Sequence, residues 1–184
     1  MNGNRAAVAA VVAVVLLATG WWLFRRGGTG EPVDLIATFD QAEKRPGANA
    51  FEVRDAQIGS ETRRAIVIPP TAGTRLIWKV RVPDDAWLRV WVGLLPDVWD
   101  QAGDGVQFRV GVSDGRTYED LAVQHVNPIA NQGDRKWLQV MVDLSAYSGE
   151  EIQLILNTDA SPPGKPYDTQ NDLAAWGAPE IVVR

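Results

Sequence analysis

Few residues of this 184-residue chain have the types and spacing that enzyme chemistry needs. His125 is the single histidine, and cysteine is absent, so paired-histidine and cysteine metal sites, thiolate nucleophiles and disulfides are all excluded. No serine has the sequence context of a nucleophile elbow, and no glycine-rich phosphate loop precedes a helix pattern. The acidic residues are scattered through turn-like segments, so no glycosidase pair of carboxylates can be identified. The sequence therefore predicts a protein that is not an enzyme.

Three aspartates give the nearest approach to a metal site: Asp97, Asp100 and Asp104. Calcium takes about six to eight oxygen ligands, so an aspartate-rich loop is a candidate for a structural calcium site. The spacing of these residues is not that of an EF-hand loop. The alternative is that Asp and Gly favour turns here through local backbone hydrogen bonds. No other cofactor is predicted.

Tryptophan is in excess, with eight in the chain and six of them beyond the N-terminal apolar segment. Trp87, Arg89 and Trp91 share one face of a predicted strand whose other face is apolar. Trp137 and Met141 share the outward face of a later strand. Exposed aromatic and Met side chains mark docking surfaces for proteins, and flat aromatic rings also bind sugar rings. The alternative is that a neighbouring segment covers these rings.

The elements that would position these residues are strands, because hydrophobic residues recur at every second position along most of the chain. Gly, Pro, Asp and Asn separate the strands, and no convincing amphipathic helix follows residue 30. We therefore predict a mainly β protein, an antiparallel β-sandwich or jelly roll. The predicted strands lie within 33–39, 51–58, 64–68, 76–82, 88–94, 106–112, 138–144, 152–156 and 181–183, and long polar connections lie at 124–136 and 159–172.

An uncharged segment of 19 residues, 6–24, precedes this region. A helix rises about 1.5 Å per residue, so the segment is close to the roughly 30 Å hydrocarbon core of a bilayer. Trp21 and Trp22 suit the headgroup boundary, and Arg25 and Arg26 can reach the phosphates beyond it. We predict a single N-terminal transmembrane helix, so that the membrane is one partner of the chain.

We predict two parts, a membrane anchor with a short linker in residues 1–30 and a β-sandwich domain in residues 31–184. A cleaved secretory signal is the alternative for the first part, because residues 18–20 (Ala-Thr-Gly) are small enough for a signal peptidase. The count of flanking arginines alone favours a cytoplasmic domain. A lone anchor before a β-sandwich suits an exported protein better, so we predict a periplasmic or extracellular domain.

The charge of the chain limits its partners. The formal net charge is −5, and every acidic residue lies after the apolar segment. Three arginines flank that segment, so the domain that follows is more acidic than the whole chain. Nucleic acid requires a clustered basic surface. We therefore predict no nucleic-acid partner.

Several segments of the domain resemble galactose-binding-like jelly-roll domains. Residues 137–149 (WLQVMVDLSAYSG), 150–158 (EEIQLILNT) and 176–181 (WGAPEI) resemble the closing half of such domains, and residues 64–66 and 99–108 are similar to the same group. These domains are known as carbohydrate-binding modules and from bacterial exported proteins. The resemblance implies a jelly-roll fold, a structural calcium in some members and glycans as a partner. It carries over no ligand site, because this fold hosts sugar binding, protein docking and structural roles.

Two functions follow from these observations. The first is a non-catalytic accessory subunit of a larger membrane complex, whose helix packs among other helices and whose sandwich docks on other subunits. Small Ala and Gly residues in the apolar segment permit close helix contact, and outward tryptophans suit a protein interface. The second function is a surface-tethered carbohydrate-binding module. We predict the first and keep the second as its alternative.

Overall fold

The computed structural model describes residues 32–68, 73–161, 164 and 168–184. The predicted transmembrane segment lies outside these residues, and so do parts of one predicted long connection. Within the described part of the chain, no helix has the length and apolar character that crossing a membrane requires. The anchor therefore stays a prediction from the sequence.

Eleven β-strands and five short 3-10 helices make up the described residues. The strands are β1 (Val33–Asp34), β2 (Glu43–Arg45), β3 (Glu52–Ile58), β4 (Glu61–Ile68), β5 (Thr74–Arg81), β6 (Ala86–Leu94), β7 (Val106–Ser113), β8 (Tyr118–Val126), β9 (Leu138–Asp143), β10 (Glu151–Asp159) and β11 (Ala174–Val183). The 3-10 helices are η1 (Phe39–Gln41), η2 (Ala48–Ala50), η3 (Pro96–Val98), η4 (Gln132–Asp134) and η5 (Ser145–Tyr147).

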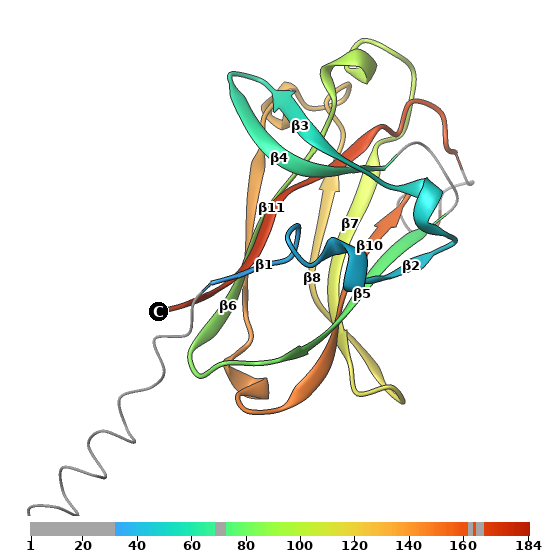
Figure 1. Ribbon diagram of the computed structural model, residues 1–184. Coiled ribbons are helices and arrows are strands. Elements are labelled where there is room, and N and C mark those ends of the chain that lie inside the picture. The colour runs from blue at the N-terminus through green and yellow to red at the C-terminus, as the bar shows by residue number, and fades with distance from the viewer. Residues whose placement is uncertain (1–31, 69–72, 162–163, 165–167) are drawn as a thin grey trace, which may run out of the picture. The chain divides into compact units, whose positions relative to one another are not determined.

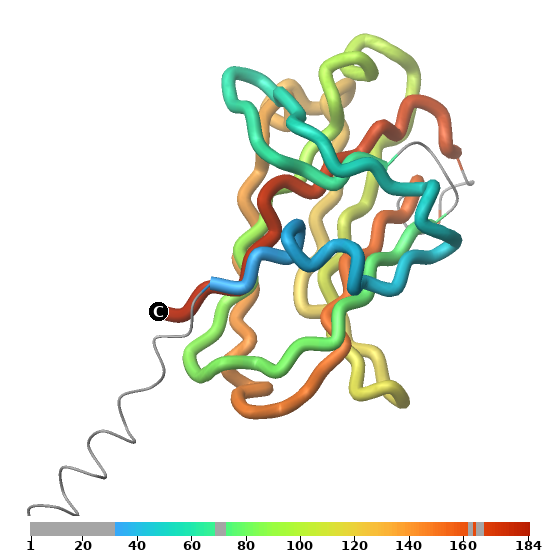
Figure 2. The backbone as a smooth tube through the Cα atoms, in the orientation of Figure 1, coloured from blue at the N-terminus to red at the C-terminus, as the bar shows by residue number. Residues whose placement is uncertain are grey.

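The strands form two antiparallel sheets that face each other (Figure 1; Figure 2). The six-stranded sheet has the order β3-β4-β11-β6-β9, with β1 also paired to β11. The five-stranded sheet has the order β2-β5-β10-β7-β8. Apart from the β3–β4 and β7–β8 hairpins, paired strands are far apart in sequence, so their register is set by burial of the alternating apolar residues. The predicted antiparallel β-sandwich is confirmed.

The main core lies between the sheets and is built from one face of each strand. On β6, Leu88 and Val90 are fully buried, and Trp87, Arg89 and Trp91, which alternate with them, are half-buried, as a period of two requires. Phe108 of β7 meets Trp176 of β11 edge to face, with ring centroids 5.0 Å apart. The indole Nε1 of Trp176 donates a buried hydrogen bond to Thr158 Oγ1 at 2.9 Å. This contact joins the two sheets at their centre.

A second, smaller core covers part of the outer face of the six-stranded sheet. Glycines at two positions allow side chains to lie directly on the backbone: Ile58 on Gly93 of β6, and Trp137 on Gly177 of β11. A Cβ added at either glycine would lie within 3 Å of these side chains, closer than packing allows. The buried residues of this core are Ala56, Ile58, Ala65, Val67, Leu95, Trp137 and Ala175.

Four strands differ clearly from the sequence-based expectation. The short β2 was not predicted. The predicted strand at 33–39 is only the two-residue β1, because η1 follows it. β11 begins several residues before the predicted 181–183. β8 was not predicted, since it is an edge strand with mostly exposed side chains and pairs with β7 through a register shift at residues 110–111. Because few of its side chains are buried, its sequence lacks the alternation that marks a strand.

Candidate functional site

Four of the five predicted docking residues lie together on the outer face of the six-stranded sheet. Trp87, Arg89 and Trp91 are half-buried on β6, and Met141 of β9 lies directly opposite Arg89. Arg89 Nη2 forms an ion pair with Glu180 Oε1 at 2.8 Å. The prediction that these side chains share a face is therefore met by the backbone register.

Arginine side chains cover both of these tryptophans. The guanidinium of Arg63 lies 3.8 Å from the centroid of the Trp91 ring, and that of Arg184 lies 4.5 Å from the centroid of the Trp87 ring. Each contact is a cation–π interaction that covers one face of the ring. These contacts favour the alternative that neighbouring residues cover the two tryptophan rings over the hypothesis that the rings form an open binding surface.

The fifth predicted docking residue, Trp137, is not exposed. Only 7% of its surface is accessible, and its Nε1 donates to the backbone oxygen of Glu61 at 3.1 Å. Its ring lies against Gly177 and packs with Ala65 and Ala175 in the second core. The outward direction was predicted correctly, but the β3–β4 hairpin covers the ring. The exposed position predicted for Trp137 as a docking residue is therefore wrong, because the ring is buried in the second core.

The three aspartates of the calcium prediction are not brought together. Asp97 is exposed, and Asp100 forms an ion pair with Arg135 at 2.9 Å. Asp104 lies near Asp172 instead, and each keeps one buried carboxylate oxygen without a hydrogen-bond partner among the described residues. Burial first, and then the charge of Asp104, raise the pKa of Asp172 to about 7. No group of three His, Cys, Asp or Glu residues in the described ranges could hold a metal ion.

Two other sequence-based expectations can be placed. The membrane-interface residues predicted between positions 21 and 26 lie outside the described residues. His125 is exposed on β8, and its Nε2 lies 3.1 Å from the backbone oxygen of Asp104. This contact gives the single histidine of the chain a backbone partner on the neighbouring connection.

A groove of about 440 Å³ lies on the outer face of the five-stranded sheet. One cross-strand row on this face consists of Arg45 of β2, Arg75 of β5, Asn157 of β10 and Arg109 of β7, in direct register. Four neighbouring strands are about 14 Å across at a spacing of roughly 4.8 Å. The row therefore presents three guanidinium groups and one amide along the groove.

The next row forms an apolar floor. Ile77 and Ile155 face each other across β5 and β10 and are only 7% and 6% exposed. Gly111 of β7 follows in the same row, and a Cβ there would lie 2.5 Å from ring atoms of Tyr118. The Tyr118 ring thus packs directly on the glycine backbone, while 42% of its surface remains accessible.

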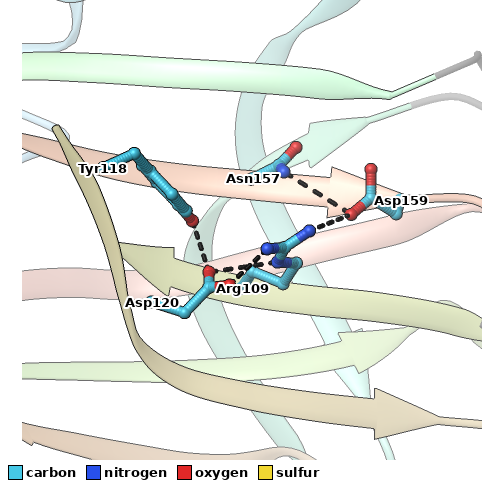
Figure 3. A network of polar contacts seen from close by, with 5 residues as sticks. All are labelled: Arg109, Tyr118, Asp120, Asn157 and Asp159. Atoms are coloured by element: carbon cyan, nitrogen blue, oxygen red, sulfur yellow. Dashed lines mark hydrogen bonds and ion pairs between the residues drawn. The ribbon is translucent and has the colours of Figure 1, made fainter. Parts of the chain in front are cut away.

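A polar network holds the Tyr118 ring in place (Figure 3). Tyr118 donates its hydroxyl proton to Asp120 Oδ1, and Arg109 Nε donates to the same oxygen at 3.1 Å. On its other side, Arg109 Nη1 lies 3.5 Å from Asp159 Oδ2, which also accepts from Asn157 Nδ2 at 3.5 Å. The network therefore links three strands, β8, β7 and β10, around the groove.

At neutral pH, Asp120 is ionised and Tyr118 is protonated. The hydrogen bond from Arg109 is the main cause that lowers the pKa of Asp120, so this carboxylate stays charged. Burial, followed by the hydrogen bond to Asp120, raises the pKa of Tyr118 to about 12. The phenol therefore stays protonated and keeps donating, which fixes the orientation of the ring.

Asn157 supplies a hydrogen-bonding group without a partner. Only 4% of its surface is exposed, and its Oδ1 has no hydrogen-bond partner among the described residues. In Figure 3 the amide nitrogen of Asn157 is joined to Asp159, and no contact is drawn to this oxygen. A buried acceptor without a donor costs free energy, so a ligand hydroxyl that donates to Asn157 Oδ1 would recover it. Because the oxygen itself is buried, a ligand hydroxyl can reach it only when the neighbouring side chains move aside. With that movement, the groove offers an apolar floor, the Tyr118 ring and this acceptor to a flat, hydroxyl-bearing molecule.

The groove was not predicted from the sequence. Two of its key residues, Tyr118 and Asp120, lie on β8, which the apolar pattern did not reveal. A detectable signal lay on β5 and β7, where Arg75 and Arg109 occupy the face opposite to the apolar residues of their strands. Outward arginines on two strands of the same sheet, which β10 separates, were therefore a better guide to the groove than the tryptophans.

Comparison with solved structures supports a shared fold. The chain superimposes on TmCBM61, determined in complex with β-1,4-galactotriose, with a TM-score of 0.52 and 12% identity over 82% of this chain and 94% of that one. It superimposes on the CBM51-2 and INT domains of Clostridium perfringens ZmpB, determined with GlcNAc, with a TM-score of 0.54 and 18% identity over 84% of this chain and 32% of that one. The domain has the jelly-roll fold of carbohydrate-binding modules.

The sequence is also similar to a curated protein. An uncharacterized protein of Archaeoglobus fulgidus is 38% identical over 104 residues, which is 56% of this chain and 25% of that protein. This chain thus spans about a quarter of the length of the relative that it matches. No family model matches the sequence.

Proposed function

We propose that the domain is a non-catalytic module that binds an oligosaccharide in the groove of the five-stranded sheet. The observation that carries this proposal is the Tyr118 ring, which is packed on Gly111, held by Asp120 and left accessible beside the groove. Sites for small ligands combine apolar and aromatic surface with a few fixed polar groups. The groove has both.

A sugar ring matches these groups chemically. Its C–H face can stack on Tyr118 and lie over the floor formed by Ile77 and Ile155, while its hydroxyl groups need hydrogen-bond partners. Asn157 Oδ1 provides an acceptor, and Gln153, which lies in register beside the floor, provides an amide. A water-soluble molecule with one apolar face is thus accommodated without leaving the buried oxygen unpaired.

The fold supports the same proposal. Both solved structures named above have carbohydrate-binding modules with bound sugars, and the chain shares their fold at low sequence identity. Of the two functions predicted from the sequence, glycan binding is thus supported better than an accessory role in a membrane complex. The tryptophan face proposed for protein docking is partly covered by arginines and by the β3–β4 hairpin.

We further propose that the module is tethered to a membrane and faces the periplasm or the cell exterior. The support is the uncharged segment at 6–24 with its aromatic and basic C-terminal end. A tether would hold the groove near polysaccharides that surround the cell. The two proposals are independent, since the groove lies entirely within the described sandwich.

The test is glycan binding by the full chain in mild detergent, measured by isothermal titration against neutral and acidic oligosaccharides. Tyr118→Ala is expected to weaken binding about tenfold, because an aromatic contact contributes roughly 1 kcal/mol or more. Trp87→Ala, on the other sheet, is the matched control and should leave the affinity unchanged. Circular dichroism checks that both variants fold.

Two results would contradict the proposal. One is that no oligosaccharide binds to the folded protein. The other is the reversed pattern, in which Trp87→Ala removes binding and Tyr118→Ala does not. That pattern would place the binding site on the six-stranded sheet and would support the docking face predicted from the sequence.

A further inference from the structure

The cross-strand row of Arg45, Arg75, Asn157 and Arg109 contains three arginines, and two of these have acidic partners. Arg45 Nε lies 2.7 Å from Glu43 Oε1, and Arg109 forms an ion pair with Asp120. Arg75 lies between them in the row, is exposed, and forms no ion pair within the described residues. The middle guanidinium of the row is therefore available to an anion from outside the chain.

The register makes this arrangement costly without a ligand. Arg45 and Arg75 are directly opposite each other on β2 and β5, where like charges destabilise a sheet. Lys79 and Arg81 follow Arg75 at alternate positions on the same face of β5, and neither forms an ion pair in the described part of the chain. One strand of an acidic protein thus presents a line of cations beside the groove.

An anion bound at Arg75 would lie next to a second unsatisfied group. Asn157 is the direct cross-strand neighbour of Arg75, and its buried Oδ1 lacks a donor within the described residues. Arg75 is also close enough to Tyr118 for its charge to act on that phenol. A ligand that satisfies this corner must carry a negative charge and a hydroxyl donor close together, next to a surface that can stack on a ring.

We propose that the groove recognises an acidic oligosaccharide, with the carboxylate of a uronic acid residue bound by the Arg75 guanidinium. This inference rests on the proposed glycan-binding function and names the class of glycan. A guanidinium and a carboxylate match in a bidentate pair. A neighbouring hydroxyl of the same sugar donates to Asn157 Oδ1, and a ring of the chain stacks on Tyr118.

The experiment compares each acidic ligand with its own neutral form. Oligogalacturonate and alginate oligosaccharides, and the methyl esters of both, are titrated into the full chain in mild detergent at low salt. We expect at least one acid to bind ten or more times more tightly than its ester. Arg75→Gln should remove this preference by weakening binding of the acid about tenfold while leaving the ester unchanged. Arg64→Gln, an exposed arginine on the other sheet, should change neither.

The remaining outcomes separate this inference from the proposed function. Equal binding of acid and ester, with no effect of Arg75→Gln, overturns the uronate inference and leaves glycan binding intact. Dextran sulfate is the control for unspecific attraction to polyanions. If it binds as tightly as the acid, and binds equally well to Arg75→Gln, the uronate inference is overturned too. If the folded protein binds neither the acids, the esters nor neutral oligosaccharides, both the inference and the proposed function fail.

Discussion

Two aspartates of this domain have opposite environments. Asp120 accepts hydrogen bonds from Arg109 and Tyr118, which lower its pKa and keep it ionised as the centre of the groove network. Asp172 is 4% exposed, and burial, followed by the negative charges of Asp104 and Asp168, raises its pKa to about 7. The same side chain therefore organises a site in one place and strains the fold in the other.

Replacing Asp172 should reveal that strain as a dependence on pH. An unfolded Asp titrates near 3.9, and the raised pKa of the folded state means that the native protein binds the extra proton between about pH 4 and pH 7. The stability due to Asp172 is thus complete below pH 4 and is lost as pH rises to about 7. We expect Asp172→Asn to become progressively more stable than the native chain over this range, measured by urea denaturation.

Asp143→Asn provides a control of the opposite sign. Hydrogen bonds from Ser145 lower the pKa of Asp143, so its contribution is present above the unfolded pKa and is lost in acid. Its stability difference from the native chain should change only in acid. If the curves of Asp172→Asn and the native chain run parallel from pH 4 to pH 8, the raised pKa is wrong.

At the scale of elements, the β3–β4 hairpin has an unexpected role. It continues the six-stranded sheet and also covers part of its outer face, where Ile58 lies on Gly93 and Trp137 lies on Gly177. The sheet is thus apolar on both faces near the hairpin. Tryptophan at position 137 contributes stability rather than recognition.

Trp137→Ala is expected to lower the free energy of unfolding by about 3–5 kcal/mol, because it empties the second core and removes the hydrogen bond to Glu61. Trp87→Ala should cost about 1 kcal/mol or less, since the half-buried Trp87 ring loses mainly its contact with Arg184. Chemical denaturation of both variants measures the difference. A folded, fully stable Trp137→Ala protein would mean that the ring is not buried.

The sequence was sufficient to predict the strands that have one apolar face. The alternation of Leu88, Val90 and Val92 located β6 and its inward face, and β7, β9 and β10 were found in the same way. It was insufficient where tertiary packing decides the outcome. Alternation shows that Trp137 points outward, but only the three-dimensional structure shows a hairpin above it.

The candidate site was hidden for a related reason. β8 is an edge strand with a register shift, so neither its existence nor the meeting of Tyr118 with Gly111 follows from a period of two. The row from Arg45 to Arg109 joins strands that are distant in sequence, and their order in the sheet is a property of the topology. No local pattern contains that order.

At the scale of the whole molecule, the two sheets differ in what their outer faces do. The six-stranded sheet carries the second core and tryptophans capped by arginines, whereas the five-stranded sheet carries the groove. In the proposed function, the outer face of one sheet adds to stability and the outer face of the other binds the glycan. A substitution in the groove can therefore alter binding with little effect on folding.

The predicted anchor belongs to the same scale. Because segment 6–24 is long enough to span a bilayer and ends in Trp and Arg residues, we expect the mature protein to keep it. Intact-mass analysis of protein extracted from membranes should give the mass of the full chain. A mass that lacks about the first twenty residues would identify the segment as a cleaved signal.

The one-sided placement of the groove has a consequence for how firmly a polymer can be held. A long polysaccharide repeats the same sugar many times, yet a module with recognition on one sheet engages it through a single short stretch. Individual contacts of this kind dissociate readily. Strong adhesion would then arise when many copies on one surface engage the same chain, because each bound copy raises the effective concentration for the next. The density of the protein on that surface, rather than the affinity of one groove, would decide whether the polymer stays attached.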